Sequence, residues 1–111
     1  MEYTGIFPDD VRAIVPGLMS QDGLGNNAVV HVKFFQPWGH WTWYVLDGES
    51  VLNDDGFEED FRFFGYVIGD FPELGYFSLN ELKSLEGPFG LKIERDMLWL
   101  PTKLKDCPGY K

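Results

Sequence analysis

The sequence contains a single cysteine, Cys107, among its 111 residues. One thiol cannot form an intramolecular disulfide, and it rules out zinc sites built from four cysteines. No stretch of the chain approaches the roughly 20 apolar residues that a helix needs to cross a bilayer. The first residues, 1–5, also lack the basic start and apolar run of a signal peptide. The sequence therefore predicts a cytoplasmic protein.

Basic residues are scarce. Nine Lys and Arg stand against eighteen Asp and Glu, which gives a net charge of −9. Residues 1–81 hold three bases and fourteen acids, a net charge of −11. Nucleic acids and anionic membranes both need positive charge opposite their phosphates. The composition therefore argues against direct binding to either, and it suits a protein partner that carries a basic surface.

Motifs of enzymes and cofactor sites are also absent. The glycines at 23 and 25 do not stand between a strand and a helix, as a phosphate-binding loop requires, and there is no Gly-x-Ser-x-Gly elbow. The only histidines, His31 and His40, are placed roughly 13 Å apart by the hairpin predicted below, too far to share a metal. Cys107 has no histidine near it in sequence to act as a base. We predict a protein that is not an enzyme and has no metal or cofactor.

Aromatic residues, by contrast, are abundant. They make up 17% of the chain, with four Trp, five Tyr and ten Phe. Each buried aromatic side chain removes roughly 150–250 Å² from water, so half of them would supply most of a core. The length fits one domain, and no linker or repeat divides residues 1–111. We expect an ordered core over about residues 5–101 and a loose, lysine-bearing tail at 102–111.

The clearest supersecondary pattern is a β-hairpin with strands over residues 29–35 and 40–46, joined by a four-residue loop. In the register that this loop sets, the apolar residues of both strands share one face, and Trp41 and Trp43 point inward. The predicted pairs are Phe35 with His40, Phe34 with Trp41, Val32 with Trp43, and Val30 with Val45.

The rest of the chain predicts short elements. Ser78 and Glu81 have the spacing of a capping box, which marks the start of a helix. Glu94-Arg95-Asp96 is typical of a charged turn. The other expected elements are a helix over 7–15, a strand over 62–68, a short strand at 76–77 and an edge strand over 97–100. Together they predict an α+β fold, an antiparallel sheet of about four to five strands with two short helices packed on one face.

An acidic segment runs from Asp47 to Asp60 without a single base. We expect a solvated, mobile loop, because the segment combines like charges with two glycines. A calcium loop with Gly56 at its sixth position fails, because Val51 would then occupy the first position, which needs a carboxylate. The run could instead imitate nucleic-acid phosphates and bind a basic groove. Its candidate partner-binding residues are Asp47, Glu49, Asp54, Asp55, Glu58, Glu59 and Asp60.

The hairpin face opposite the tryptophans supplies the other candidates. In the predicted register it holds His31, Lys33 and Phe35 on one strand, opposite Tyr44, Thr42 and His40 on the other. If no other element covers it, this face is a mixed aromatic and polar surface of the type found at interfaces. If it is covered, it forms a second core layer. The candidate partner-binding residues here are Trp38, His40 and Tyr44.

Five short segments follow one another in a characteristic order: Val32-Lys33-Phe34-Phe35, Trp41-Thr42-Trp43-Tyr44, Phe63-Phe64-Gly65-Tyr66-Val67, Glu73-Leu74-Gly75-Tyr76-Phe77-Ser78-Leu79 and Ile93-Glu94-Arg95-Asp96. In these segments the chain resembles a bacterial family, the domain of unknown function 2958, from about Ala28 to Pro101. No activity is established for that family, so the resemblance implies no catalytic residues. Its members are typically encoded on plasmids, phages and integrated elements. The resemblance therefore implies a role in maintaining such an element or in blocking host defence.

Three functions remain open from the sequence. The first is a small, acidic, non-catalytic interaction protein of a mobile genetic element that binds a protein partner and inhibits or regulates host nucleic-acid or defence machinery. The second is a homo-oligomeric structural component that buries an uncovered aromatic face by symmetry. The third is a small-ligand-binding protein or enzyme with an aromatic pocket. That pocket would be lined by Trp38, Trp41, Trp43 or Tyr44 and served by His40 or Glu94.

Overall fold

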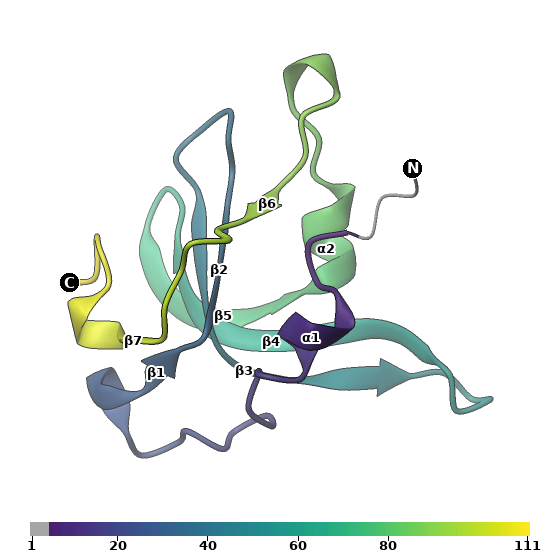
Figure 1. Ribbon diagram of the computed structural model, residues 1–111, viewed down its shortest axis with the longest axis horizontal. Helices are drawn as coiled ribbons and strands as arrows, with labels where there is room; N and C mark the ends of the chain where they lie inside the picture. Colours follow the sequence, from purple (N-terminus) through teal and green to yellow (C-terminus); the bar gives the residue numbers. More distant parts are fainter. Residues whose placement is uncertain (1–4) are drawn as a thin grey trace.

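The computed structural model describes residues 5–111 of the chain, which form a five-stranded antiparallel sheet and a smaller second sheet (Figure 1). The large sheet has the order β5-β4-β3-β2-β6. Its strands are β2 (Val32–Phe35), β3 (Thr42–Leu52), β4 (Glu58–Ile68), β5 (Pro72–Ser78) and β6 (Glu94–Arg95). The small sheet pairs β1 (Val29–Val30) with β7 (Thr102–Lys103). The predicted α+β class is confirmed, and the small sheet is an addition to it.

Two short helices, α1 (Asp9–Arg12) and α2 (Leu79–Ser84), lie on one face of the large sheet. Helix α2 begins at the predicted capping box, where the Ser78 hydroxyl accepts a hydrogen bond of 3.1 Å from the backbone N–H of Glu81. Helix α1 is shorter than the predicted span of 7–15, and Ile14 is exposed rather than buried. Three single turns of 3-10 helix complete the elements: η1 (Gly25–Asn27), η2 (Pro88–Gly90) and η3 (Leu104–Asp106).

The face under the helices buries a phenylalanine core. Phe63 is fully buried at its centre, with ring centroids 5.0 Å from Phe7, 5.3 Å from Phe77 and 5.6 Å from Phe34. Trp43 is buried in the same core, as predicted from the hairpin pattern. The remaining buried members are Ile6, Val11, Val32, Val45, Phe61, Leu79, Leu82 and Ile93.

The opposite face buries a second, tyrosine core under the C-terminal residues. The hydroxyl of Tyr44 donates to the carbonyl of Pro108 at 2.7 Å, and the rings of Tyr66 and Tyr110 lie 4.9 Å apart. The other buried members are Ala28, Val30, Leu46, Leu104 and Cys107. The expectation of a loose tail at 102–111 is therefore wrong, because apolar side chains of this segment cover one face of the sheet.

The β2–β3 hairpin forms with a register two residues away from the predicted one. Phe34 pairs with Trp43, and Phe35 pairs with Thr42. The loop therefore spans residues 36–41, and Trp41 leaves the ladder to pack its ring beside Gly69, where a Cβ would lie 2.4 Å away. A shift of two residues keeps every side chain on its face, so the inward direction was correct although the pairs were not.

The first strand of this hairpin is also interrupted. The ladder between β2 and β3 begins at Val32, while Val30 belongs to β1 in the small sheet. Val30 consequently lies in the tyrosine core and does not pair with Val45. The residue between them, His31, is half-buried, and this burial lowers its pKa.

The acidic segment is paired strand, which corrects the expectation of a mobile loop. Strands β3 and β4 continue beyond the body of the sheet and pair as far as Leu52 with Glu58. Asn53 closes the turn, since its side-chain oxygen accepts from the backbone N–H groups of Asp55 and Phe57, both at 3.0 Å. Gly56 has φ 84°, the left-handed conformation that such hairpin turns require.

Two further predictions near the C-terminal end are wrong. Glu94-Arg95, predicted as part of a charged turn, forms the edge strand β6 beside β2. The predicted edge strand over residues 97–100 is irregular, because this segment leaves the sheet and anchors through Trp99, whose indole N–H donates to the Val30 carbonyl at 3.1 Å. The strands predicted at 62–68 and 76–77 are present and longer.

Candidate functional site

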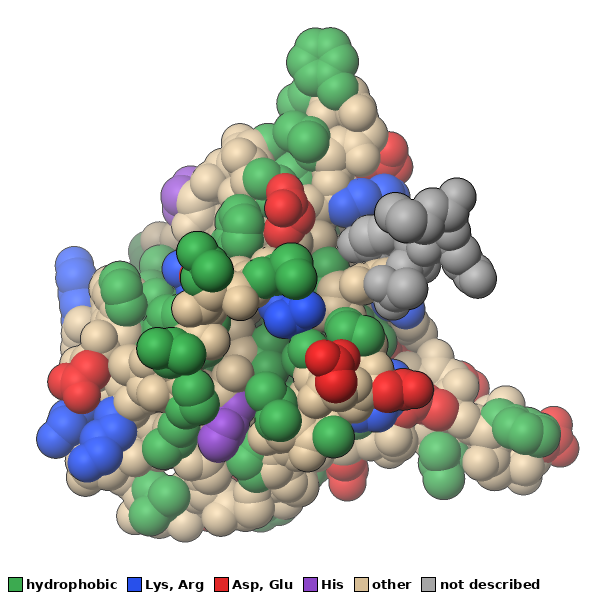
Figure 2. Space-filling view, in the orientation of Figure 1, with side chains coloured by type: hydrophobic (Ala, Val, Ile, Leu, Met, Phe, Trp, Pro, Cys, Tyr) green, Lys and Arg blue, Asp and Glu red, His purple; other side chains and the backbone are tan. Residues whose placement is uncertain are grey.

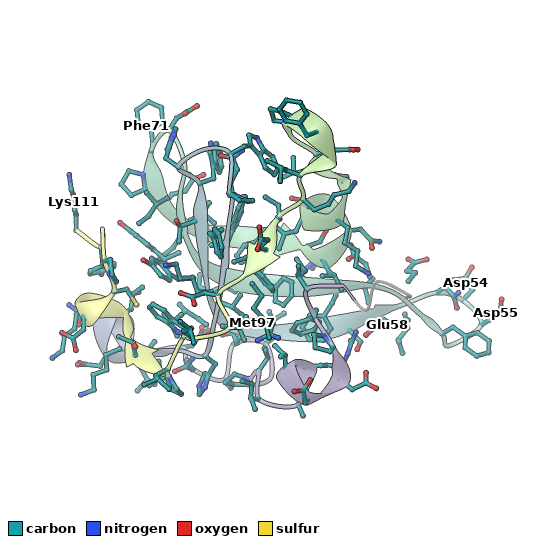
Figure 3. The ribbon with its side chains drawn as sticks, turned by 45° about the horizontal axis from the view of Figure 1, so that its top comes forward. Asp54, Asp55, Glu58, Phe71, Met97 and Lys111 are labelled. Atoms are coloured by element: carbon teal, nitrogen blue, oxygen red, sulfur yellow. The ribbon has the colours of Figure 1, made fainter. Side chains whose placement is uncertain are left out.

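A projecting surface feature is the acidic arm, residues 49–59, which comprises the paired ends of β3 and β4 and the turn between them (Figure 1). Figure 3 shows Asp54 and Asp55 at its far end, with Glu58 nearer to the body of the protein. Leu52 and Phe57 expose 58% and 71% of their surface beside these carboxylates. Acidic and hydrophobic side chains therefore occur together on the arm, as the space-filling view shows (Figure 2).

Contacts at its base fix the arm to the helical face. Glu58 accepts a hydrogen bond from Ser50 at 2.6 Å and forms an ion pair with Arg12. The Arg12 guanidinium also lies 5.0 Å from the centre of the Phe61 ring. Asp60 accepts from the backbone N–H groups of Phe61 and Asn80, at 2.7 and 3.0 Å. Glu58 and Asp60 thus hold the arm in place, while Glu49, Asp54, Asp55 and Glu59 are exposed to solvent.

Two predicted partner-binding residues, Tyr44 and Asp47, are buried and do not form part of the exposed surface of the arm or the hairpin. Tyr44 is 2% exposed in the tyrosine core, and burial is the main cause that raises its pKa to about 12. Asp47 is 1% exposed, although it belongs to the acidic run in sequence. Both assignments are therefore corrected. Of the two possibilities considered for this hairpin face, the covered one holds at Tyr44, whose side chain belongs to a second core layer.

The other two candidates, Trp38 and His40, lie in the loop before β3, whereas the acidic arm begins at Glu49, near the other end of this strand. The first seven residues of β3 separate these two places, roughly 20 Å at the usual rise per residue. His40 is exposed and lies 3.9 Å from the carboxylate of Asp70. The structure therefore does not bring the aromatic and acidic candidates into one site.

Protein atoms already pack against the tryptophans that were considered as pocket walls. Trp43 lies inside the phenylalanine core, and Trp41 packs beside Gly69. The ring of Trp38 lies so close to Gly87 that a Cβ there would be 2.3 Å away. These contacts weigh against the aromatic ligand pocket considered from the sequence.

Sequence reasoning missed two exposed phenylalanines. Phe71 in the turn between β4 and β5 is 80% exposed, and Phe89 in η2 is fully exposed (Phe71 is labelled in Figure 3). Phe89 also has φ 59°, a left-handed conformation that is uncommon for a bulky residue. The signal was available, because both phenylalanines adjoin prolines and so stand in turns rather than in strands.

The sequence also gave no sign that Asp47 differs from the other acids. Its pKa is raised by burial, an effect that the backbone N–H of Met19 opposes and the charge of Asp22 reinforces. Among residues 5–111, no group of three or more His, Cys, Asp or Glu side chains is arranged to hold a metal ion. Within the same residues, no helix is long and apolar enough to cross a membrane.

Comparison with known proteins yields one match. Residues 14–104 match the family described as protein of unknown function (DUF2958). This match covers most of the chain and confirms the resemblance drawn from its motifs. No curated protein and no solved structure matches the chain.

Proposed function

Because the chain belongs to the DUF2958 family, whose description names no activity, we propose its function from the structure: a non-catalytic module that binds a protein partner through its acidic arm. The observation that carries this proposal is the pairing of β3 with β4 along the arm, which holds exposed carboxylates and apolar side chains on one projecting element.

The arm combines two features that protein partners recognise. Charges of one sign attract and orient a surface of the opposite sign, mainly by raising the rate of association. Exposed aromatic and aliphatic side chains, here Phe57 and Leu52, serve as anchors that fill pockets on the partner. The strand pairing adds pre-organisation, since little chain entropy remains to be lost when a partner binds.

In its finer form, the proposal makes the partner a nucleic-acid-binding protein of the host and this chain its inhibitor, encoded on a mobile genetic element. The resemblance to the family motivates this form. Imitation of phosphates requires carboxylates held at fixed positions, and a paired strand meets that requirement better than a mobile loop would.

The test compares two triple variants with the same change in charge. Asp54→Asn/Asp55→Asn/Glu59→Gln neutralises exposed carboxylates of the arm without touching those that fix its base. Asp10→Asn/Glu73→Gln/Asp106→Asn neutralises three exposed carboxylates elsewhere. Each immobilised protein captures partners from a bacterial lysate at low salt and at about 0.15 M salt, and the captured proteins are quantified by mass spectrometry.

We expect a set of basic proteins whose recovery falls with salt and with the arm variant, and is retained by the control variant. Phe57→Ser should reduce recovery of the same set without changing its salt dependence. Equal recovery by the two triple variants, or recovery that ignores salt, would overturn the assignment of binding to the arm.

A further inference from the structure

A β-bulge places Asp47 on the tyrosine face of the sheet. Val45 pairs with Gly65, but Asp47 pairs with Phe64, so β3 carries one extra residue between them. Without the bulge, the alternation of a strand would turn the Asp47 carboxylate toward the phenylalanine core, with Val45. Bulges occur often beside functional sites, where they redirect a side chain. Here the bulge brings Asp47 to the same side as Leu46 and Phe64.

Asp47 is the only buried charged side chain among residues 5–111. Its Oδ1 atom is inaccessible to water and has no hydrogen-bond partner within those residues. No Lys, Arg or His nitrogen of the described residues lies within 4.0 Å of the carboxylate. A buried carboxylate with no cation beside it and one oxygen without a partner is costly, so it needs a physical reason.

A second carboxylate stands beside Asp47. Asp22 lies on the loop that crosses this face, and it is close enough for its charge to raise the pKa of Asp47. The neighbouring Gln21 fixes the loop: its amide nitrogen donates to the carbonyls of Val29 at 2.8 Å and Leu46 at 2.6 Å, and its oxygen accepts from the Val29 N–H at 2.7 Å. The position of Asp22 is therefore set by the fold.

Two adjoining pockets of about 240 and 200 Å³ share Asp22, Asp47 and Phe64 in their walls. Aromatic rings and apolar side chains supply most of the remaining lining, from Met19, Leu46, Leu74, Tyr76, Leu104 and Tyr110. None of the lining residues is a Lys or Arg. Two acids facing aromatic rings, with no base among them, make an environment that attracts a positive charge on an apolar body.

We propose that this site, the Asp47 pocket, binds an organic cation: a guanidinium or primary ammonium group on a short apolar stem. Asp47 and Asp22 supply two negative charges that attract the cationic head, and the rings of Phe64 and Tyr76 contact the stem. This inference goes beyond the proposed function and does not depend on the acidic arm.

The donor set favours an organic cation over a metal ion. Calcium takes six to eight oxygen ligands, and magnesium demands near-octahedral oxygen geometry. The Asp47 pocket offers two carboxylates and the Asn26 amide among aromatic and aliphatic walls, and the Gln21 amide is already bonded to backbone groups. A planar guanidinium, by contrast, donates to carboxylates and stacks on aromatic faces at the same time.

The test titrates ethylguanidinium chloride into the whole protein at pH 8 and follows the amide resonances of residues 22, 47 and 64 by NMR. Ethylurea, a neutral molecule of nearly the same shape, is the matched probe, and sodium chloride keeps the ionic strength constant. We expect saturable shifts with ethylguanidinium, at least tenfold weaker binding of ethylurea, and stronger binding of the cation as the pH rises and Asp47 loses its proton.

Asp47→Asn should weaken ethylguanidinium binding about tenfold or more, and Asp22→Asn, an exposed loop substitution that keeps the fold, should weaken it severalfold. Asp55→Asn on the arm is the control and should leave binding unchanged. Equal binding of ethylurea, no shifts at the three amides, or equal effects of Asp55→Asn and Asp22→Asn would each overturn the proposal.

The same titration separates the two sources of such a cation. A blocked Gly-Arg-Gly peptide that binds as well as ethylguanidinium indicates an arginine side chain from a protein. Binding of ethylguanidinium without the peptide indicates a free small molecule. Binding of magnesium chloride in place of either, with no response to ethylguanidinium, would overturn the proposed ligand class. Loss of partner capture in the arm variant, with ethylguanidinium binding retained, would show that the two proposals stand separately.

Discussion

The two faces of the large sheet are built from different chemistry. The phenylalanine core holds hydrocarbon side chains and one indole, closed by two helices. The tyrosine core holds phenol groups and a thiol, closed by the irregular C-terminal segment. A hydrocarbon face only needs shape to match, whereas each polar atom on the other face needs a partner. The first face therefore determines the fold, and the second leaves room for a binding site.

In the body of the sheet, two irregularities of the backbone fall on the second face for the same reason, whereas the register shift between Val51 and Leu52 lies in the arm. The break at His31 moves Val30 into the tyrosine core, and the bulge after Val45 turns Asp47 toward it. The bulge turns a side chain toward this face. The break at His31 frees the Val30 carbonyl, which accepts a hydrogen bond from the Trp99 indole. On the phenylalanine face, β3 and β4 keep strict alternation past Phe63 and Phe61.

The largest test of this contrast compares two neighbouring residues of β4 that point to opposite faces. Phe63→Ala removes a fully buried ring, and we expect a loss of about 3–5 kcal/mol in the free energy of unfolding. Phe64→Ala removes a half-buried ring, and the expected loss is about 1–2 kcal/mol. Urea denaturation followed by tryptophan fluorescence measures both.

Equal losses at the two positions would break the comparison, because they would show that the tyrosine face contributes as much to stability as the phenylalanine core. The slope of the unfolding free energy against urea should stay the same in both variants, which checks that the denatured states are alike.

The next largest expected change in stability concerns the buried carboxylate of Asp47 on the tyrosine face. The pKa of Asp47 is raised in the folded protein, so folding favours the protonated carboxyl group. The free energy of unfolding therefore falls as the pH rises from the pKa of Asp47 in the unfolded chain to its higher pKa in the folded protein. Asp47→Asn removes the charge. We therefore expect it to raise the free energy of unfolding by about 1–3 kcal/mol at pH 7, because a neutral amide costs less to bury than a charged carboxylate.

The gain should shrink toward pH 3, where Asp47 is protonated in both states, and thermal unfolding at several pH values measures it. Asp55→Asn, an exposed residue of the arm tip, serves as control and should show no such trend. A variant that loses stability at pH 7 would mean that Asp47 is stabilising as an anion. The Asp47 pocket then could not be described as a site that gives up stability for binding.

The sequence predicted the phenylalanine side of the molecule well and the tyrosine side poorly. Alternation fixes the face of a residue, so Trp43 was placed correctly even though its partner was shifted by two positions. The capping box at Ser78 is a local signal and was equally readable. The confirmed α+β class follows from such local and periodic patterns.

The bulge, by contrast, has no local signature, because nothing in the residues around Asp47 shows that the alternation slips there. From the sequence alone, Asp47 has the same predicted role as its acidic neighbours, and only the pairing with Phe64 distinguishes it from them. The arm could have been found: Asn53-Asp54-Asp55-Gly56 fits a hairpin turn with glycine in the left-handed position. The expectation of a mobile loop followed from the density of like charges in this segment rather than from its turn residues.

The smallest expected effect tests how the C-terminal residues close the second face. Tyr44→Phe removes only the hydroxyl that donates to the Pro108 carbonyl at 2.7 Å. Because Pro108 is exposed and water can replace the lost donor, we expect a loss of only about 1 kcal/mol, the net value of one hydrogen bond. Tyr76→Phe, whose ring is 60% exposed, is the matched control and should be neutral.

Hydrogen exchange of the Tyr44→Phe variant should quicken at the Leu104, Cys107 and Tyr110 amides, all bonded to backbone carbonyls, and stay unchanged in β4. Faster exchange across β4 as well would mean that the two faces unfold as one unit, and their contrast would then be one of composition alone.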